Sequence, residues 1–170
     1  MTLRIVLSGV ESVGKSTLAA DLAAHFNAAL VPEYGRTYCE GLDRPLTPAD
    51  LTAIAEGHAR GAHRAMQQAP ACLIEDTDIL MTAAWARMLF GAPQPDLAAW
   101  PSHAHLHLLL LPDVPFVSDP VRVFGDPGQR LAFHRHVVAE FIERRTSLVP
   151  VGGGWDARRA RAIAAIESCL

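Results

Sequence analysis

One short segment constrains the fold of this chain more than any other. Residues 9–16 read Gly-Val-Glu-Ser-Val-Gly-Lys-Ser and match the pattern G-x-x-x-x-G-K-[S/T] in full. Residues 3–8 before it form an apolar run typical of a buried strand, and the apolar residues between 15 and 26 recur at helical spacing. The sequence therefore predicts a strand, a glycine-rich loop and a helix, in the order that a phosphate-binding loop requires.

The residues of this loop have the chemistry to bind the phosphates of ATP. Glycines let backbone N–H groups surround a phosphate chain, the lysine reaches the β and γ phosphates, and the hydroxyl after it ligates Mg²⁺. We expect ATP to be bound by Gly9, Glu11, Ser12, Val13, Gly14, Lys15, Ser16 and Thr17, with Ser16 on the metal. Lys15 is the only lysine among 15 basic residues, and arginine does not replace a compact ammonium everywhere. The alternative is a glycine turn with an exposed lysine.

Strands and helices alternate along the rest of the chain. Short apolar runs predict four further strands, and helical patterns follow them, the first after a Thr-Pro-Ala-Asp start at residues 47–50. This order predicts an α/β fold of the P-loop NTPase type, with three α/β/α layers and a mostly parallel five-stranded sheet. We expect one kinase-like domain over residues 1–170, with a lid segment at about 113–130, where prolines and glycines are frequent.

Composition excludes several classes of protein. The formal net charge is −3 and both signs are mixed along the chain, so no surface for nucleic acid is expected. The longest apolar run is far shorter than a membrane span, and the first residues lack a signal-peptide cleavage site. Three cysteines without CxxC spacing indicate reduced thiols. We therefore expect a cytoplasmic protein without membrane contact, whose oligomeric state the sequence does not predict.

Acidic residues follow two of the predicted strands and are candidates for the chemistry. Asp76 comes after the third strand, where a metal-binding carboxylate is expected, and we expect it to hold Mg²⁺ together with Ser16. Asp78 is either a functional residue or the N-cap of the next helix. Glu33 follows the second strand, at the edge where ligands bind in open α/β sheets, and is otherwise a solvated loop residue.

Two arginines and two aromatic residues are further candidates. Arg122 and Arg130 bracket a segment rich in proline and glycine and are placed to neutralise a transferring phosphoryl group, unless they are ordinary surface arginines. Phe116 and Trp155 are expected in loops beyond the fourth and fifth strands, where they would stack on a base or an aromatic substrate. Trp85 is expected in the core.

Several motifs, in order along nearly the whole chain, resemble a known family. Besides the glycine-rich loop they are Pro32-Glu33-Tyr34-Gly35-Arg36, Ala55-Glu56-Gly57-His58, Asp76-Thr77-Asp78 with Thr82, and residues 112–119 with Arg122. Together they resemble the ribosylnicotinamide kinase domain of the NadR-like NAD-biosynthesis proteins. The loop alone is unspecific, whereas the Glu-Tyr-Gly-Arg and Asp-Thr-Asp blocks make the match specific.

The resemblance implies an enzyme that transfers a phosphoryl group from ATP to the 5′-hydroxyl of nicotinamide riboside, giving nicotinamide mononucleotide. Together with the reasoning above it gives Lys15, Glu33, Asp76, Arg122 and Arg130 as catalytic residues. The nucleotide would also contact Trp155, and the riboside would contact Glu33, Tyr34, Arg36, Asp78, Phe116 and Asp119. In the family this domain is usually fused to an adenylyltransferase domain. The 170 residues show no such domain, so we expect a free-standing kinase at most.

The chain departs from the family at one place, and other functions stay open. It has Phe116 and Ser118-Asp119-Pro120 where a tryptophan and an Asp-Asp-Gly stretch are common in the family. The same parts would also suit a nucleotide-binding switch, an ATPase without a small-molecule acceptor, or a kinase for another nucleoside. No residue that reads the base is identifiable, so the sequence does not distinguish ATP from GTP.

Overall fold

The computed structural model describes residues 1–118 and 124–170, and its centre is a parallel β-sheet. The strand order is β2-β3-β1-β4-β5, and every neighbouring pair is parallel. The strands are β1 (Leu3–Ser8), β2 (Ala29–Val31), β3 (Cys72–Asp76), β4 (Leu106–Leu110) and β5 (Val149–Val151). All strands point the same way, so their carboxyl ends meet at one edge, with β1 in the middle. This arrangement confirms the predicted fold class.

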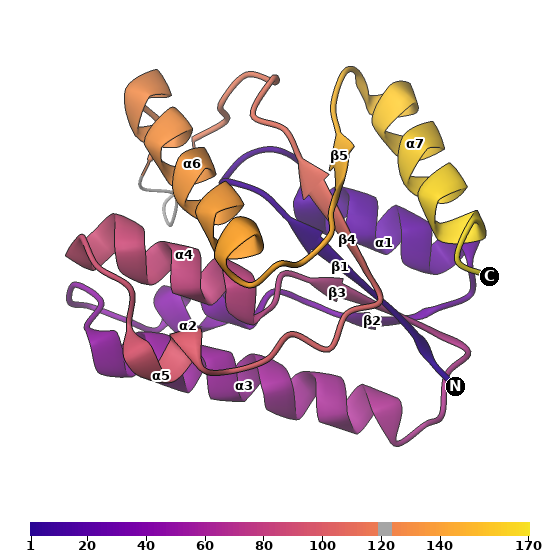
Figure 1. Ribbon diagram of the computed structural model, residues 1–170, viewed down its shortest axis with the longest axis horizontal. Helices are drawn as coiled ribbons and strands as arrows, with labels where there is room; N and C mark the ends of the chain where they lie inside the picture. Colours follow the sequence, from indigo (N-terminus) through magenta and orange to yellow (C-terminus); the bar gives the residue numbers. More distant parts are fainter. Residues whose placement is uncertain (119–123) are drawn as a thin grey trace.

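Helices cover both faces of the sheet, giving three layers (Figure 1). The helices α1 and α7 pack together on one face, and α3, α4 and α6 lie on the other. The bounds are α1 (Lys15–His25), α2 (Tyr34–Glu40), α3 (Pro48–Met66), α4 (Ile79–Phe90), α5 (Pro95–Ala98), α6 (Pro127–Glu143) and α7 (Trp155–Glu167). Within the described ranges, no helix has both the length and the apolar character needed to cross a bilayer.

The central strands are buried because helices lie on both faces. Ile5 and Leu7 of β1, Ile74 of β3, and Leu108 and Leu110 of β4 are all fully buried. Burying each such side chain contributes about 1.5 to 3 kcal/mol relative to its exposure. The carboxyl ends of β1, β3 and β4 therefore form a rigid platform for the loops that follow them.

Local signals explain most helix starts. Thr47 caps α3 in a reciprocal capping box with Asp50, as predicted, with Pro48 in the first turn. Two short helices, α2 and α5, are absent from the sequence prediction. Trp155 is also a correction, because it is the first residue of α7 and does not lie in the loop where it was expected.

Candidate active site

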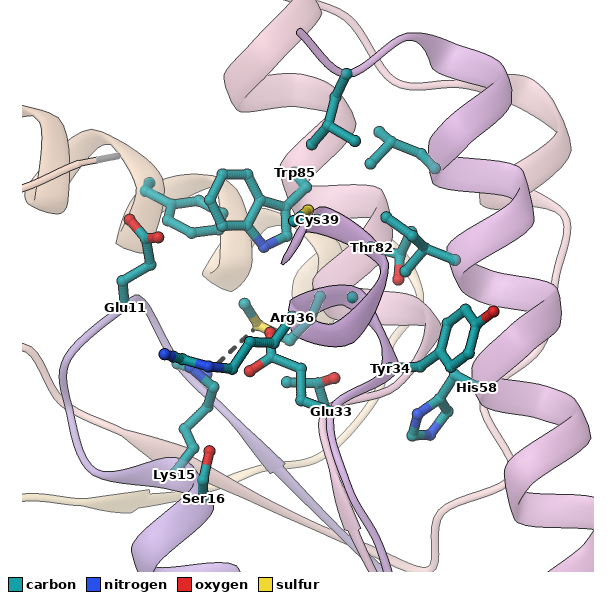
Figure 2. Close-up of a pocket in the computed structure, with 18 of the residues that line it drawn as sticks. Glu11, Lys15, Ser16, Glu33, Tyr34, Arg36, Cys39, His58, Thr82 and Trp85 are labelled. Carbon is teal, nitrogen blue, oxygen red and sulfur yellow. Dashed lines mark hydrogen bonds between the residues drawn. The ribbon is translucent and has the colours of Figure 1, made fainter. Parts of the chain in front are cut away.

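A cavity of about 520 Å³ opens where the chain leaves the carboxyl ends of β1, β2 and β3. The glycine-rich loop forms one side of it, with Lys15 and Ser16 at the start of α1 (Figure 2). Glu33, Tyr34 and Arg36 form another side. The structure thus brings together the phosphate-binding loop and the acidic motif after β2, as the sequence predicted.

The glycine-rich loop has the backbone shape that its glycines allow. Gly9 and Gly14 have φ angles of +142° and +86°, values that residues with a side chain rarely adopt. A Cβ atom on Gly9 would lie 2.7 Å from the carbonyl oxygen of Leu110, so the loop also needs glycine for its close approach to β4. The Lys15 ammonium donates to the Val10 carbonyl, with an Nζ–O distance of 3.0 Å, and so folds over the loop. This geometry places the lysine beside the N–H groups that would surround a phosphate.

Two predicted carboxylates, Glu33 after β2 and Asp76 at the end of β3, lie at the same edge of the sheet as this loop. Burial raises the pKa of Glu33, the Asp76 charge raises it further, and the Lys15 ammonium opposes both effects. Asp76 ends β3, is only 2% exposed, and its Oδ1 atom has no hydrogen-bond partner among the described residues. A buried carboxylate oxygen without a partner needs a cation, a water molecule or a donor. Asp76 therefore fits the task of binding Mg²⁺ or a water of its shell.

The metal would depend on the nucleotide for most of its remaining ligands. Within residues 1–118 and 124–170, no three His, Cys, Asp or Glu side chains are grouped so that they could hold a metal ion. Mg²⁺ is commonly bound by one or two protein groups together with phosphates and water. The Ser16 hydroxyl and the Asp76 carboxylate match that donor set.

The other end of the cavity is apolar, and its aromatic wall is a residue that sequence reasoning missed. Trp85 packs against the core, as expected, but it also lines the cavity together with Met81 and Leu89 of the same helix, α4. These three residues recur every fourth position and therefore share one face of the helix. This four-residue spacing could have predicted from the sequence that the three side chains form one wall. It was hidden because α4 is apolar on nearly all sides, as a buried helix is.

The segment between β4 and α6 is held by side chains of the glycine-rich loop. The Ser12 hydroxyl accepts a hydrogen bond from the Val117 backbone N–H (2.7 Å), and the Glu11 carboxylate accepts one from the Phe124 N–H (2.9 Å). Both Glu11 and Ser12 were also expected to contact the nucleotide. In this structure they also hold two points, Val117 and Phe124, within the segment 113–130 that was predicted as a lid. Residues 119–123, which include the predicted site residues Asp119 and Arg122, lie outside the described part of the chain.

Arg130 also reaches the glycine-rich loop. Its guanidinium donates to the backbone oxygens of Val114 (3.0 Å) and Glu11 (3.5 Å), and lies 5.7 Å from the centre of the Phe116 ring. Phe116 was predicted as a stacking residue for the substrate, but it is not one of the residues that line the cavity. It packs against Gly125, where a Cβ atom would lie 2.8 Å from the ring.

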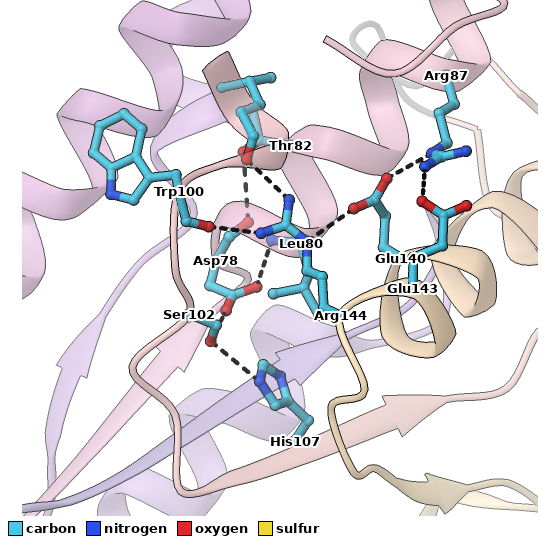
Figure 3. Close-up of polar contacts among 11 residues, drawn as sticks. Asp78, Leu80, Thr82, Arg87, Trp100, Ser102, His107, Glu140, Glu143 and Arg144 are labelled. Carbon is cyan, nitrogen blue, oxygen red and sulfur yellow. Dashed lines mark hydrogen bonds and ion pairs between the residues drawn. The ribbon is translucent and has the colours of Figure 1, made fainter. Parts of the chain in front are cut away.

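Asp78 and Trp155, like Asp76 and Arg130, are also not among the residues that line the cavity. Asp78 is the N-cap of α4, the alternative that the sequence left open, and its carboxylate also accepts a 2.5 Å hydrogen bond from Ser102 (Figure 3). Trp155 is 41% exposed and lies against the outer side of the loop, where a Cβ on Gly14 would be 3.3 Å from its ring. Its position beside the loop is compatible with the predicted contact to the nucleotide base.

Arg158 is a buried residue that the sequence did not single out. Its guanidinium is almost fully buried and donates to the carbonyl oxygens of Val13, Leu111 and Gly153, and it forms an ion pair with Asp113. One side chain of α7 therefore ties the glycine-rich loop to the ends of β4 and β5. Nothing in the local sequence distinguishes it from the neighbouring Arg159, whose side chain is 39% exposed.

Curated relatives of this chain are known from two bacteria. It is 30% identical over 173 aligned residues to the trifunctional NAD biosynthesis/regulator protein NadR of Salmonella typhimurium, and equally to that of Escherichia coli. Each alignment covers 98% of this chain but 42% of the relative. The chain therefore spans less than half the length of these proteins.

Solved structures show the same fold. Two crystal structures of NadR, one with NAD and AMP-PNP and one with NR, superpose with TM-scores of 0.77 and 0.81, at 23% and 24% identity. Each covers 98% of this chain, and the chain covers 49% and 51% of them. A thymidylate kinase from Ehrlichia chaffeensis superposes with a TM-score of 0.70 at 13% identity, over 99% of both chains. Residues 4–158 match the AAA-domain family AAA_28, and with its phosphate-binding loop and P-loop kinase-like fold the chain belongs to that family and is homologous to NadR.

Proposed function

We propose that this chain is an ATP-dependent kinase that phosphorylates the 5′-hydroxyl of nicotinamide riboside and gives nicotinamide mononucleotide. The observation that carries the proposal is the single cavity that joins the phosphate-binding loop, the Glu33 carboxylate and an apolar wall with Trp85. A switch or a simple ATPase needs only a water molecule beside the γ-phosphate. The apolar part of the cavity, lined by Met81, Trp85 and Leu89, supports an organic acceptor. The NadR relatives, one of them crystallised with NR, support the choice of riboside.

The reaction would proceed by positioning and by neutralisation of charge. Lys15 and the loop N–H groups would bind the β and γ phosphates, and Arg130 would add positive charge from the start of α6. The 5′-oxygen of the riboside would attack the γ-phosphorus while the bond from that phosphorus to the bridging oxygen breaks, releasing ADP. Glu33 would orient the hydroxyl and accept its proton. Ser16 and Asp76 would hold Mg²⁺, which neutralises charge on the phosphates when bound.

Several further predicted roles belong to this proposal. We propose Tyr34 and Arg36, which line the cavity, as contacts of the riboside, and Trp155 as a contact of the nucleotide base. Asp78 and Phe116 lie away from the cavity lining, so any part they play in riboside binding would be indirect. The roles predicted for Asp119 and Arg122 belong to residues outside the described ranges.

A panel of acceptors tests the proposal. Nicotinamide riboside and the common nucleosides are each incubated with ATP or GTP and Mg²⁺, and the phosphorylated product is measured by chromatography. We expect nicotinamide riboside with ATP to give the highest kcat/KM. Lys15→Ala should lower turnover by about 10²-fold or more, because the phosphates lose a preorganised positive group, while the circular dichroism spectrum is unchanged. Preference for another nucleoside would replace the substrate, and ATP hydrolysis without any phosphorylated acceptor would overturn the kinase assignment.

A further inference from the structure

The short helix α2 depends on its neighbours for its position. It has seven residues, and none of its side chains is fully buried. Helices of this length are not stable on their own in water. Glu33 is the N-cap residue of α2, so any contact that places this helix also places the Glu33 carboxylate in the cavity.

The closest of these contacts is a tyrosine ring packed on a glycine. The Tyr34 side chain lies between α2 and α3 (Figure 2), and a Cβ atom built on Gly57 of α3 would lie 2.0 Å from the Tyr34 Cε1 atom. The same Cβ would lie 2.4 Å from two other atoms of the ring. No arrangement of a methyl group fits these distances, so the ring occupies the space that any other residue at position 57 would fill.

Gly57 has a cost for the helix that holds it. It lies in the interior of the 19-residue helix α3, where glycine is about 1 kcal/mol less favourable than alanine. Gly61, one turn further along, differs: a Cβ there would meet only the Val31 Cγ1 atom, at 3.4 Å, an ordinary contact. Of the two glycines in α3, only Gly57 is required by close packing, because the Tyr34 ring fills the space of its side chain.

Two more contacts lie on the same face of α3. The Tyr38 hydroxyl donates a 2.7 Å hydrogen bond to Asp50, and a Cβ on Gly35 would lie 3.4 Å from Ile54. Positions 50, 54 and 57 are four and three residues apart and therefore form one stripe on the helix. The helix α2 is thus seated along α3 by a row of contacts, of which the ring on Gly57 belongs to the residue that follows Glu33 in the chain.

We propose that Gly57 is a positioning residue for the site: its missing side chain lets the Tyr34 ring dock on α3, and this docking holds the Glu33 carboxylate in the cavity. The inference rests on the proposed kinase function, in which Glu33 orients the acceptor hydroxyl. Within the Ala-Glu-Gly-His motif of residues 55–58, the inference therefore gives the glycine a specific role.

The test compares Gly57→Ala with Gly61→Ala on the same helix. Both variants exchange a helical glycine for alanine, but only the first displaces the tyrosine ring. We expect Gly57→Ala to lower kcat with the riboside by about 10-fold or more, because displacement of a reacting group by about 1 Å is that costly. The affinity for ATP, measured by calorimetry, should stay within about twofold, since a twofold change is only about 0.4 kcal/mol. Gly61→Ala should keep the wild-type kcat. Equal kcat values in wild type and Gly57→Ala would overturn the proposal.

A double variant shows whether the effect passes through the ring. Once Tyr34→Ala has removed the ring, adding Gly57→Ala should change kcat by less than about twofold, since the two residues then no longer contact each other. An equal loss in both backgrounds would overturn the proposed route. If Gly57→Ala alone fails to fold, recovery of folding in the double variant supports the clash, and failure of both overturns it.

A measurement without turnover separates this inference from the kinase assignment. The Glu33 carboxyl carbon is followed by NMR as the pH is changed, in the wild type and in both glycine variants. We expect its titration midpoint to move in Gly57→Ala and to stay in place in Gly61→Ala. If the wild type phosphorylates no acceptor, the proposed function fails, while this titration still decides whether Gly57 positions Glu33. An unchanged midpoint in Gly57→Ala would overturn the positioning role.

Discussion

Glu33 is the residue at which function and stability oppose each other. Its pKa is raised chiefly by burial, so the folded chain holds the proton of this carboxyl more tightly than the unfolded chain does. The stabilising contribution of that proton is fully present below the ordinary pKa of glutamate and is lost as the pH rises through the folded value. Above the folded pKa, the ionised carboxylate therefore destabilises the fold that places it.

The first prediction is that Glu33→Gln lowers activity and raises stability together. Loss of the base should reduce kcat by about 10²-fold, the usual share of general-base catalysis. The variant's Tm should exceed that of the wild type at pH 7, by roughly 2 to 4 °C for each kcal/mol recovered. Calorimetric scans at pH 4 and pH 7 measure this, and the difference between the two proteins should shrink at the lower pH. A constant Tm difference would show that the Glu33 charge does not destabilise the fold.

The second prediction separates Asp76 from the groups that bind phosphate directly. Asp76→Asn should weaken ATP binding in the presence of Mg²⁺ by about 10- to 100-fold, the usual effect of removing a group that supports a metal. Binding with EDTA present should change little, because the carboxylate acts through the cation. Titration calorimetry under both conditions provides the comparison, with Lys15→Ala as the control that weakens binding in each. Equal losses with and without Mg²⁺ would argue against a metal role for Asp76.

At the scale of elements, the strands and long helices were predictable because each carries a local signal. The helix that starts at Thr47 was predicted with its cap, and α4 was expected as one of the helical patterns after a strand. In the structure Asp78 caps α4 and Gly91 ends it. By contrast, α2 lacks a buried stripe, a capping side chain and an acidic first turn. Its position comes from α3, a contact that a single sequence does not reveal.

The third prediction concerns the buried arginine of α7. Arg158→Lys should lower the free energy of unfolding by about 2 to 4 kcal/mol, because a lysine cannot satisfy three separate backbone carbonyls and leaves some of them unpaired. The Tm should fall by roughly 5 to 15 °C. Arg159→Lys is the matched control: it is the next residue, its partner Asp21 is also solvent-exposed, and the change should stay within about 0.5 kcal/mol. Urea unfolding monitored by circular dichroism measures both, and similar losses in the two variants would contradict the prediction.

At the scale of the whole molecule, the polar half of the cavity was predictable and the apolar half was not. Lys15, Ser16 and Glu33 follow the ends of strands, and the rule that parallel strands end at one edge is enough to bring them together. The apolar wall depends on which face of α4 turns toward the cavity. That choice is made by packing against other elements rather than by local sequence. Trp85, for example, stacks on Phe124 and contacts the Phe133 ring at a tilted angle.

Long-range ion pairs support this packing. Arg87 of α4 binds Glu140 and Glu143 of α6, and Arg144 joins Glu140 to the backbone carbonyls of Leu97 and Trp100 (Figure 3). The pairing crosses about 50 residues of chain and holds the far ends of both helices together. The near end of α6, which carries Arg130, is thereby placed over the glycine-rich loop.

The single lysine gives the chain a built-in chemical reporter. Apart from the α-amino group, Lys15 provides the one primary amine of a 170-residue sequence, and the remaining basic side chains are arginines. Acylating reagents that react with amines but not with guanidinium groups can therefore label one side chain, and that side chain lies in the phosphate-binding loop. The extent of labelling, read by mass spectrometry of the intact protein, would report occupancy of the loop directly in an unmodified chain, where most proteins would first need their surface lysines replaced.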